Sequence, residues 1–251
     1  MSAGELVAIA LAGLAAGTIN TVVGSGTLIT FPVLLAFGYA PVTANVSNTI
    51  GLVPGSVSGA IGYRRELAGQ GSRALRLGTM SVAGGITGAV LLLVLPASAF
   101  KAIVPVFIAV ALVLTVLQPR LAALLLRREI DLERRRAGAA TSIAVYFTGV
   151  YGGYFGAAQG ILLLAILGVA LAQDLQRTNA LKNVLAGLVN GVAGVYFIFA
   201  AHVDWGPAAI IAVASIAGAQ LGARYGRRLP PTALRALIVV VGIFAIVRLL
   251  M

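Results

Sequence analysis

Long stretches of this chain carry few charged residues or none, and this feature constrains the fold more than any other. The clearest stretches are residues 6–23, 74–95 and 233–247. The hydrocarbon core of a bilayer is about 30 Å thick, and a helix of roughly 20 apolar residues crosses it. Membrane-spanning strands alternate apolar and polar residues, whereas these stretches do not alternate. The pattern therefore predicts an all-α integral membrane protein with several spans.

The composition supports this class and excludes others. Of the 251 residues, 60% are hydrophobic and 10% are charged, whereas a soluble domain carries about 25% charged residues. The net charge of +11 would also suit a nucleic-acid-binding protein. However, the arginines gather between the apolar stretches, at residues 64–76, 120–136 and 224–235, as they do in cytoplasmic loops. The chain has no cysteine, which excludes thiolate metal sites. We expect the lipid bilayer as a partner, and no nucleic acid, cofactor or metal.

The two halves of the chain resemble each other when the sequence is shifted by 134 residues. Alanine and leucine coincide by chance in so biased a composition, but asparagine and proline do not. Without any gap, the shift superimposes Gly26 on Gly160, Asn45 on Asn179 and Pro96 on Pro230. We therefore divide the chain into a first transmembrane repeat (1–117), a basic cytoplasmic linker (118–134) and a second transmembrane repeat (135–251).

Each repeat shows the same order of segments. An apolar segment (6–23 or 139–157) ends in a glycine-rich break, and a short apolar piece follows (28–39 or 161–171). A dozen residues span only about 18 Å as a helix, so we expect a broken or re-entrant helix there. Three full spans then complete each repeat, near residues 43–63, 74–95 and 99–117, and near 178–201, 207–225 and 232–250.

The charges of the loops give the two repeats opposite orientations. The loops 64–76 and 120–136 are basic, and 95–99 is nearly uncharged. In the second half, residues 201–204 include no lysine or arginine, whereas 224–235 include four arginines. With basic loops in the cytoplasm, this pattern predicts two inverted-topology repeats. That architecture is common among secondary transporters, which bind substrate between the repeats.

Polar residues inside the apolar segments form two clusters, each present in both repeats. The first cluster is the glycine break, and the second opens the helix after the short piece. Glycine lets the backbone unwind, and a helix that begins after the break points an anion-attracting N-terminus inward. The alternative is close helix packing by small residues. The predicted substrate-binding residues are Asn20, Gly24, Ser25, Gly26, Thr27, Gln159 and Gly160 in the first cluster, and Asn45, Asn48, Thr49, Asn179, Lys182 and Asn183 in the second.

Lys182 is the most unusual of these residues. It shares a helix face with Asn179 and Asn183, and this face extends inward to Asn190, as the equivalent face extends to Ser56. A lysine inside a span costs about 2.5–3.5 kcal/mol on insertion scales, so it usually has a partner or a role. The alternative is that Lys182 lies near the start of its helix and snorkels to the interface.

Several of these runs resemble one family. Residues 24–32 (GSGTLITFP), 44–48 (ANVSN), 154–160 (YFGAAQG) and 178–183 (TNALKN) are similar to the motifs of the sulfite exporter TauE/SafE family of bacterial permeases. The resemblance covers nearly the whole chain. Two departures are visible: the glycine-rich first motif is reduced to Gly-Ser-Gly, and Thr49 stands where the family often has a lysine. The resemblance implies a bacterial inner (plasma) membrane protein that moves sulfur oxyanions or organosulfonates.

We therefore expect a permease, not an enzyme, with no catalytic residues. It would carry a small anion such as sulfite, an organosulfonate or a related carboxylate by alternating access, and a homodimer is a possible assembly. An anion channel is the main alternative, because glycine breaks with inward helix ends also build filters. An intramembrane enzyme is disfavoured by the absence of cysteine and by a single histidine outside the spans. Uniport, anion exchange and coupling through neutral groups all stay open.

Overall fold

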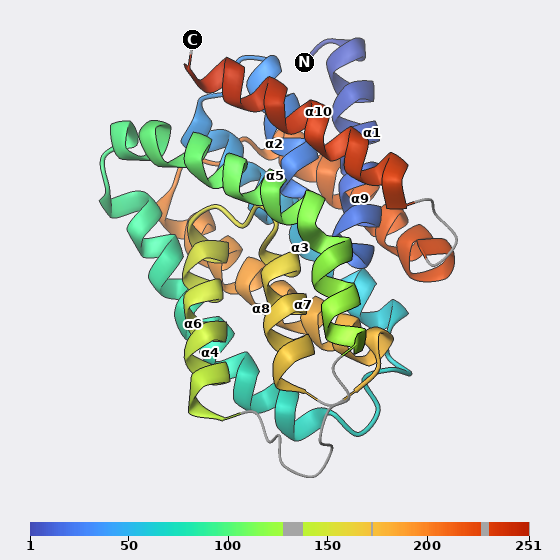
Figure 1. Cartoon of the computed structure of the whole chain (residues 1–251). Coiled ribbons are helices and arrows are strands. Elements are labelled where there is room, and N and C mark those ends of the chain that lie inside the picture. Colours follow the sequence, from blue (N-terminus) through green and yellow to red (C-terminus); the bar gives the residue numbers. More distant parts are fainter. Residues whose placement is uncertain (128–137, 172, 227–230, 251) are drawn as a thin grey trace.

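The described part of the chain folds into ten helices. The computed structural model describes residues 1–127, 138–171, 173–226 and 231–250, and no strand occurs in these ranges (Figure 1). The helices of the first half are α1 (Ala3–Val22), α2 (Thr27–Ala36), α3 (Pro41–Gly62), α4 (Gly71–Val94) and α5 (Ala97–Arg127). Those of the second half are α6 (Ala139–Tyr154), α7 (Gln159–Ala170), α8 (Leu175–Ala200), α9 (Trp205–Tyr225) and α10 (Pro231–Leu250).

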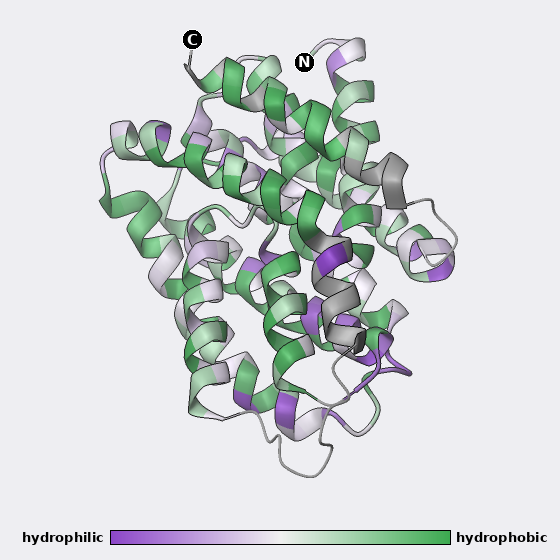
Figure 2. Ribbon diagram, viewed as in Figure 1, coloured by the Kyte–Doolittle hydropathy of each residue, from purple (hydrophilic) through white to green (hydrophobic). Residues whose placement is uncertain are grey.

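The order of the helices confirms the segments expected from the sequence. Both short helices are present, with 10 residues in α2 and 12 in α7. Among the described residues, five helices are long and apolar enough to cross a bilayer: α1, α4, Ala97–Leu117 of α5, α8 and α9. The helices at the expected full spans 43–63 and 232–250, α3 and α10, are not among these five. Figure 2 shows hydrophobic residues along most of the helices and a group of strongly hydrophilic residues near the α3–α4 connection. The chain therefore has the character of a multi-pass membrane protein.

Two boundaries differ from the expectation. The helix α6 has only 16 residues, because its last turn ends at Tyr154 and the break begins there. The helix α5 continues past the expected end of its span at residue 117 and reaches Arg127. The expected linker (118–134) therefore begins as helix, and residues 128–134 lie outside the described part of the chain.

The first helix of each half packs against the fourth helix of the other half: α1 lies along α9, and α6 lies along α4. Glycines permit this contact. A Cβ atom at Gly218 of α9 would lie 2.0 Å from the Leu14 carbonyl oxygen of α1, and one at Gly88 of α4 would lie 2.0 Å from the Val150 carbonyl oxygen of α6. Small residues at helix interfaces are typical of membrane proteins, where close packing drives association. The two halves are thus interlocked.

Side-chain contacts place the helix connections at two ends of the molecule. At the first end, the Tyr39 hydroxyl between α2 and α3 donates to Glu5 near the start of α1. Burial, together with the Glu5 carboxylate, raises the pKa of this hydroxyl, which therefore stays a donor. The Asp204 amide, which precedes α9, donates to Ser47 Oγ near the start of α3 at 2.8 Å. The helices α1 and α2 therefore form a hairpin that begins and ends at this end.

The second end joins the α3–α4 connection to the α7–α8 connection. The guanidinium of Arg177 donates to the Ala68 carbonyl at 2.9 Å, and Gln70 Nε2 donates to the Arg177 carbonyl at 3.0 Å. Since α3 runs from the first end to the second and α8 runs from the second to the first, these two helices are antiparallel. They also contact each other directly.

An aromatic cluster supports the centre of the molecule. Phe31 of α2, Phe100 of α5 and Phe155 between α6 and α7 are all buried. The Phe31 ring meets the Phe155 ring edge to face, with centroids 5.1 Å apart, and Phe100 packs on both at 6.3 and 6.1 Å. Such edge contacts add to the free energy of burial. They hold α2, α5 and the α6–α7 break together.

Candidate functional site

The two glycine-rich breaks meet at the centre of the molecule. The Gly160 amide donates to the Gly24 carbonyl at 3.0 Å, so the backbones of the two halves are hydrogen-bonded to each other. A Cβ atom at Gly24 would lie 2.4 Å from the Gly160 Cα atom, and Gly24 has φ +92°. Both the contact and the backbone conformation require glycine here. The structure thus brings together two segments that the sequence placed in separate halves.

The residue shift that superimposes the first break on the second differs from the expected shift of 134. The amides of Val23 and Gly24 both donate to the Ile19 carbonyl, and those of Phe155 and Gly156 both donate to the Tyr151 carbonyl. The equivalent of Gly24 is therefore Gly156, a shift of 132 residues. The shift returns to 134 after α7, because α7 has 12 residues and α2 has 10. The gapless pairing of Gly26 with Gly160 was wrong at this point.

The backbone amides of the break glycines are already used by the protein. The Gly26 amide donates to Asn20 Oδ1 at 2.7 Å. The Gly24 amide donates to the Ile19 carbonyl, and the Gly160 amide to the Gly24 carbonyl. The three break glycines predicted to bind substrate therefore have no free amide for a ligand. In this structure, side chains supply the donors instead.

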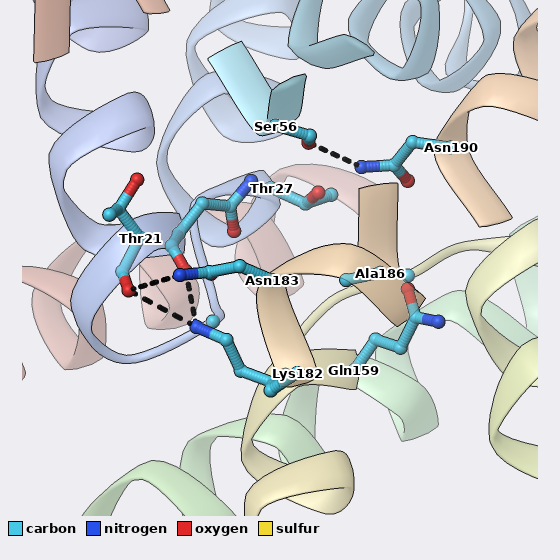
Figure 3. Close-up of a pocket in the computed structure, with 12 residues that line it drawn as sticks. Thr21, Thr27, Ser56, Gln159, Lys182, Asn183, Ala186 and Asn190 are labelled. Carbon is cyan, nitrogen blue, oxygen red and sulfur yellow. Dashed lines mark hydrogen bonds between the residues drawn. The ribbon is translucent and has the colours of Figure 1, made fainter. Parts of the chain in front are cut away.

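A small polar cavity lies between the breaks and α8 (Figure 3). Its volume of about 30 Å³ suffices for one or two water molecules. Seven predicted binding residues line it: Asn20, Gly24, Thr27, Gln159, Gly160, Lys182 and Asn183. The other lining residues are Thr21, Ser56, Gly156, Ala186 and Asn190.

Lys182 is the only charged residue among the described residues that line this cavity, and it is 1% exposed. Its ammonium donates to the carbonyls of Asn20 at 2.8 Å and Thr21 at 3.3 Å, in the last turn of α1 (Figure 3). The C-terminal end of a helix dipole attracts a cation. The side chain therefore points inward, and snorkelling to the membrane surface does not occur in this structure.

Glycine makes room for this lysine. A Cβ atom at Gly160 would lie 3.1 Å from Lys182 Cδ, which is closer than such contacts normally come. The lysine stem therefore passes directly beside the point where the two breaks touch. The same glycine thus serves both the backbone contact and the placement of the charge.

The asparagines at equivalent positions of α3 and α8 hold the breaks rather than line the cavity. Asn45 Nδ2 donates to the Tyr154 carbonyl at 3.0 Å, and Asn179 Nδ2 donates to the Thr21 carbonyl at 3.1 Å. Each caps the end of the first helix of the other half, where carbonyls lack partners within the helix. The predicted residues outside the cavity lining are Ser25, Gly26, Asn45, Asn48, Thr49 and Asn179.

Two further groups in the cavity can bind a ligand. Gln159 is 3% exposed, and its Nε2 atom has no hydrogen-bond partner among the described residues. Asn190 Nδ2 donates to Ser56 Oγ at 3.3 Å across a separation of 134 residues (Figure 3). Ser56 and Asn190 lie on the inward extensions of the two polar helix faces, but they were not among the predicted binding residues. Thr21 was missed, because its carbonyl, not its side chain, holds the lysine.

The apolar helices, the interlocked halves and the buried polar cavity define the class: a multi-pass helical membrane protein. Within that class, the chain belongs to the sulfite exporter TauE/SafE family, whose profile matches residues 9–249. This match confirms the resemblance seen in the sequence motifs. No solved structure gives a significant match.

Three relatives are named as transporters without a named substrate. The probable membrane transporter protein ORF9 of Sinorhizobium sp. is 30% identical over 243 residues, which cover 96% of this chain and 90% of the relative. The probable membrane transporter protein YfcA of Escherichia coli (strain K12) is 28% identical over 228 residues, covering 90% and 82%. A probable membrane transporter protein of Haemophilus influenzae is 24% identical over 229 residues, covering 91% and 88%.

Proposed function

We propose that this protein is a secondary transporter of a small oxyanion, such as sulfite, an organosulfonate or a related carboxylate. The observation that carries the proposal is the buried ammonium of Lys182 in a polar cavity that the unpartnered amide of Gln159 also lines. The described acidic residues, Glu5, Glu66, Asp174 and Asp204, belong to helix ends or connections. An anionic substrate would supply the negative charge that the centre of the protein lacks.

The hydrogen bonds around Lys182 leave donors for such a substrate. The Thr21 carbonyl accepts from Asn179, Lys182 and Asn183 at 3.1, 3.3 and 3.3 Å. A carbonyl oxygen has two lone pairs, so three donors exceed its capacity. An ammonium also has a third N–H, and an asparagine amide has a second. An entering anion can therefore bind Lys182, Asn183 and Gln159 without uncapping α1.

We also propose that the two halves are inverted repeats that alternate around this cavity. The antiparallel course of α3 and α8 supports this, as does the reciprocal packing of α1 on α9 and of α6 on α4. The breaks at the centre correspond to the discontinuous helices that form substrate sites in inverted-repeat transporters. The arginine-rich end at the α3–α4 connection would face the cytoplasm of a bacterial inner membrane.

Counterflow in proteoliposomes tests the proposal. Vesicles that contain purified protein and unlabelled sulfite should accumulate external labelled sulfite transiently, whereas vesicles without internal substrate should not. Sulfate, taurine and sulfoacetate, tested as competitors, rank the substrates. Saturable flux with counterflow supports a carrier. Flux that neither saturates nor exchanges would assign the protein to the channels, and the absence of any flux or binding would refute anion transport.

A further inference from the structure

Four helix ends converge on the cavity, and their dipoles oppose one another. The C-terminal end of α1 contributes Asn20 and Thr21 to the lining, and the break directly after α6 contributes Gly156, while the N-terminal ends of α2 and α7 contribute Thr27 and Gln159. A helix N-terminus acts as about half a positive charge, and a C-terminus as about half a negative one. Two of each kind cancel to first order. The helix ends therefore leave the cavity close to neutral.

The remaining formal charge is that of Lys182, and the first half has no counterpart to it. At the shift of 134 residues, the equivalent of Lys182 in α8 is Asn48 in α3. Asn48 is neutral and fully buried, and its side chain bonds to Thr30 and Thr27 of α2. Among the described residues that line the cavity, the charge therefore sums to that of one lysine.

We infer that this site selects singly charged oxyanions over doubly charged ones. The inference rests on the proposed function and specifies the charge of the substrate. A monoanion beside Lys182 leaves the buried cavity neutral. A dianion of the same shape would leave one negative charge without a counter-charge in a low-dielectric centre, which is strongly unfavourable. Asn183 and Gln159 can donate hydrogen bonds to either anion, but they add no charge.

Isosteric anions of fixed charge test the inference on purified protein in detergent. Perchlorate and sulfate share a tetrahedral shape but differ by one charge, and methanesulfonate is a second monoanion. Apparent dissociation constants come from thermal stabilisation at equal ionic strength, with Lys182→Met as the control for binding at the site. We expect both monoanions to bind roughly tenfold or more tightly than sulfate. Sulfate that binds as tightly as perchlorate would overturn the inference and leave the proposed function intact.

Two substitutions change the charge of the site in opposite directions. Asn48 lies outside the cavity lining but bonds to Thr27, which lines it, so Asn48→Lys adds a second lysine at the edge of the site and should tighten sulfate binding relative to perchlorate. Gln159→Glu has nearly the same shape and places a negative charge in the cavity that Lys182 also lines, so it should fold even if Asn48→Lys does not. It should abolish the binding of both monoanions. Unchanged anion preference in both folded variants would refute the inference. If no anion gives stabilisation that depends on Lys182, the proposed function fails as well.

Discussion

At the scale of single residues, Lys182 carries the strongest prediction. Lys182→Met keeps the length of the side chain and removes the charge. It should weaken anion binding by roughly 10- to 100-fold, because charge-assisted hydrogen bonds are lost. Thermal stability should change little, because the removal of a buried charge offsets the loss of the donor to the Asn20 carbonyl, and the Thr21 carbonyl keeps Asn179 and Asn183 as donors.

The chain provides a matched control, since Lys101 is its one other lysine and is exposed. Lys101→Met should bind anions as the unmodified protein does, in the same thermal-stabilisation assay. Lys182→Arg should rescue only part of the binding, because a planar guanidinium presents its donors differently. Equal anion affinity in Lys182→Met and Lys101→Met would remove Lys182 from the site.

Gly24 provides a second prediction at this scale. Gly24→Ala combines a strained backbone at φ +92° with a contact of 2.4 Å to Gly160 Cα. Gly38 has a similar φ of +87°, but nothing lies within 4 Å of the position that a Cβ atom would take there. Gly38→Ala therefore measures strain alone, about 1–2 kcal/mol. Gly24→Ala should lose roughly 1–3 kcal/mol more through overpacking. Thermal unfolding of the two variants checks this, and equal losses would contradict the importance of the contact.

At the scale of elements, the glycine contacts between α1 and α9 should decide folding. Gly218→Leu places a side chain where even a Cβ atom would lie 2.0 Å from the Leu14 carbonyl oxygen. This variant should yield no monodisperse protein in size-exclusion chromatography after detergent extraction. Gly191→Leu in α8 is the control, because nothing lies within 4 Å of its Cβ position. Recovery of both variants in equal amounts would show that α1 and α9 can separate at low cost.

Much of the element order could be predicted from the sequence, because apolar length and glycine breaks mark helices and interruptions directly. The contacts at the breaks could not. The two extra residues of α7 lie in a run of leucine, isoleucine and alanine. Because such residues match one another by chance, an alignment of the two halves without gaps does not reveal the insertion. Asn45 and Asn179 were predicted to bind substrate, whereas in the structure each side chain donates to a backbone carbonyl at a break. Their role as caps depends on unpaired carbonyls of the other half, and a sequence shows no such pairing.

At the scale of the whole molecule, labelling of single cysteines tests the orientation. Ser98 and His202 are exposed, and cysteines there should react with an impermeant maleimide from outside the cell. A cysteine at Gly71, which is exposed beside the α3–α4 connection, should react only after the membrane is opened. Gly71 is a better site for labelling than its neighbour Gln70, which is fully buried and bonded to Arg177. Reaction of Gly71→Cys and His202→Cys from the same side would refute the inverted repeats. Arg128 and Arg228, two further candidates for the inner side, lie outside the described residues.

The interlocking of the halves has a consequence for biosynthesis. Thr18 of α1 donates to the Gly218 carbonyl of α9, 200 residues later in the chain. At a synthesis rate of about 5–20 residues per second, α1 waits roughly 10–40 seconds for its partner. During that interval its glycine-lined face contacts lipid or the insertion machinery. A ribosome that stalls before α9 therefore leaves a membrane-inserted chain without its main packing partner, which quality-control proteases can recognise as unassembled.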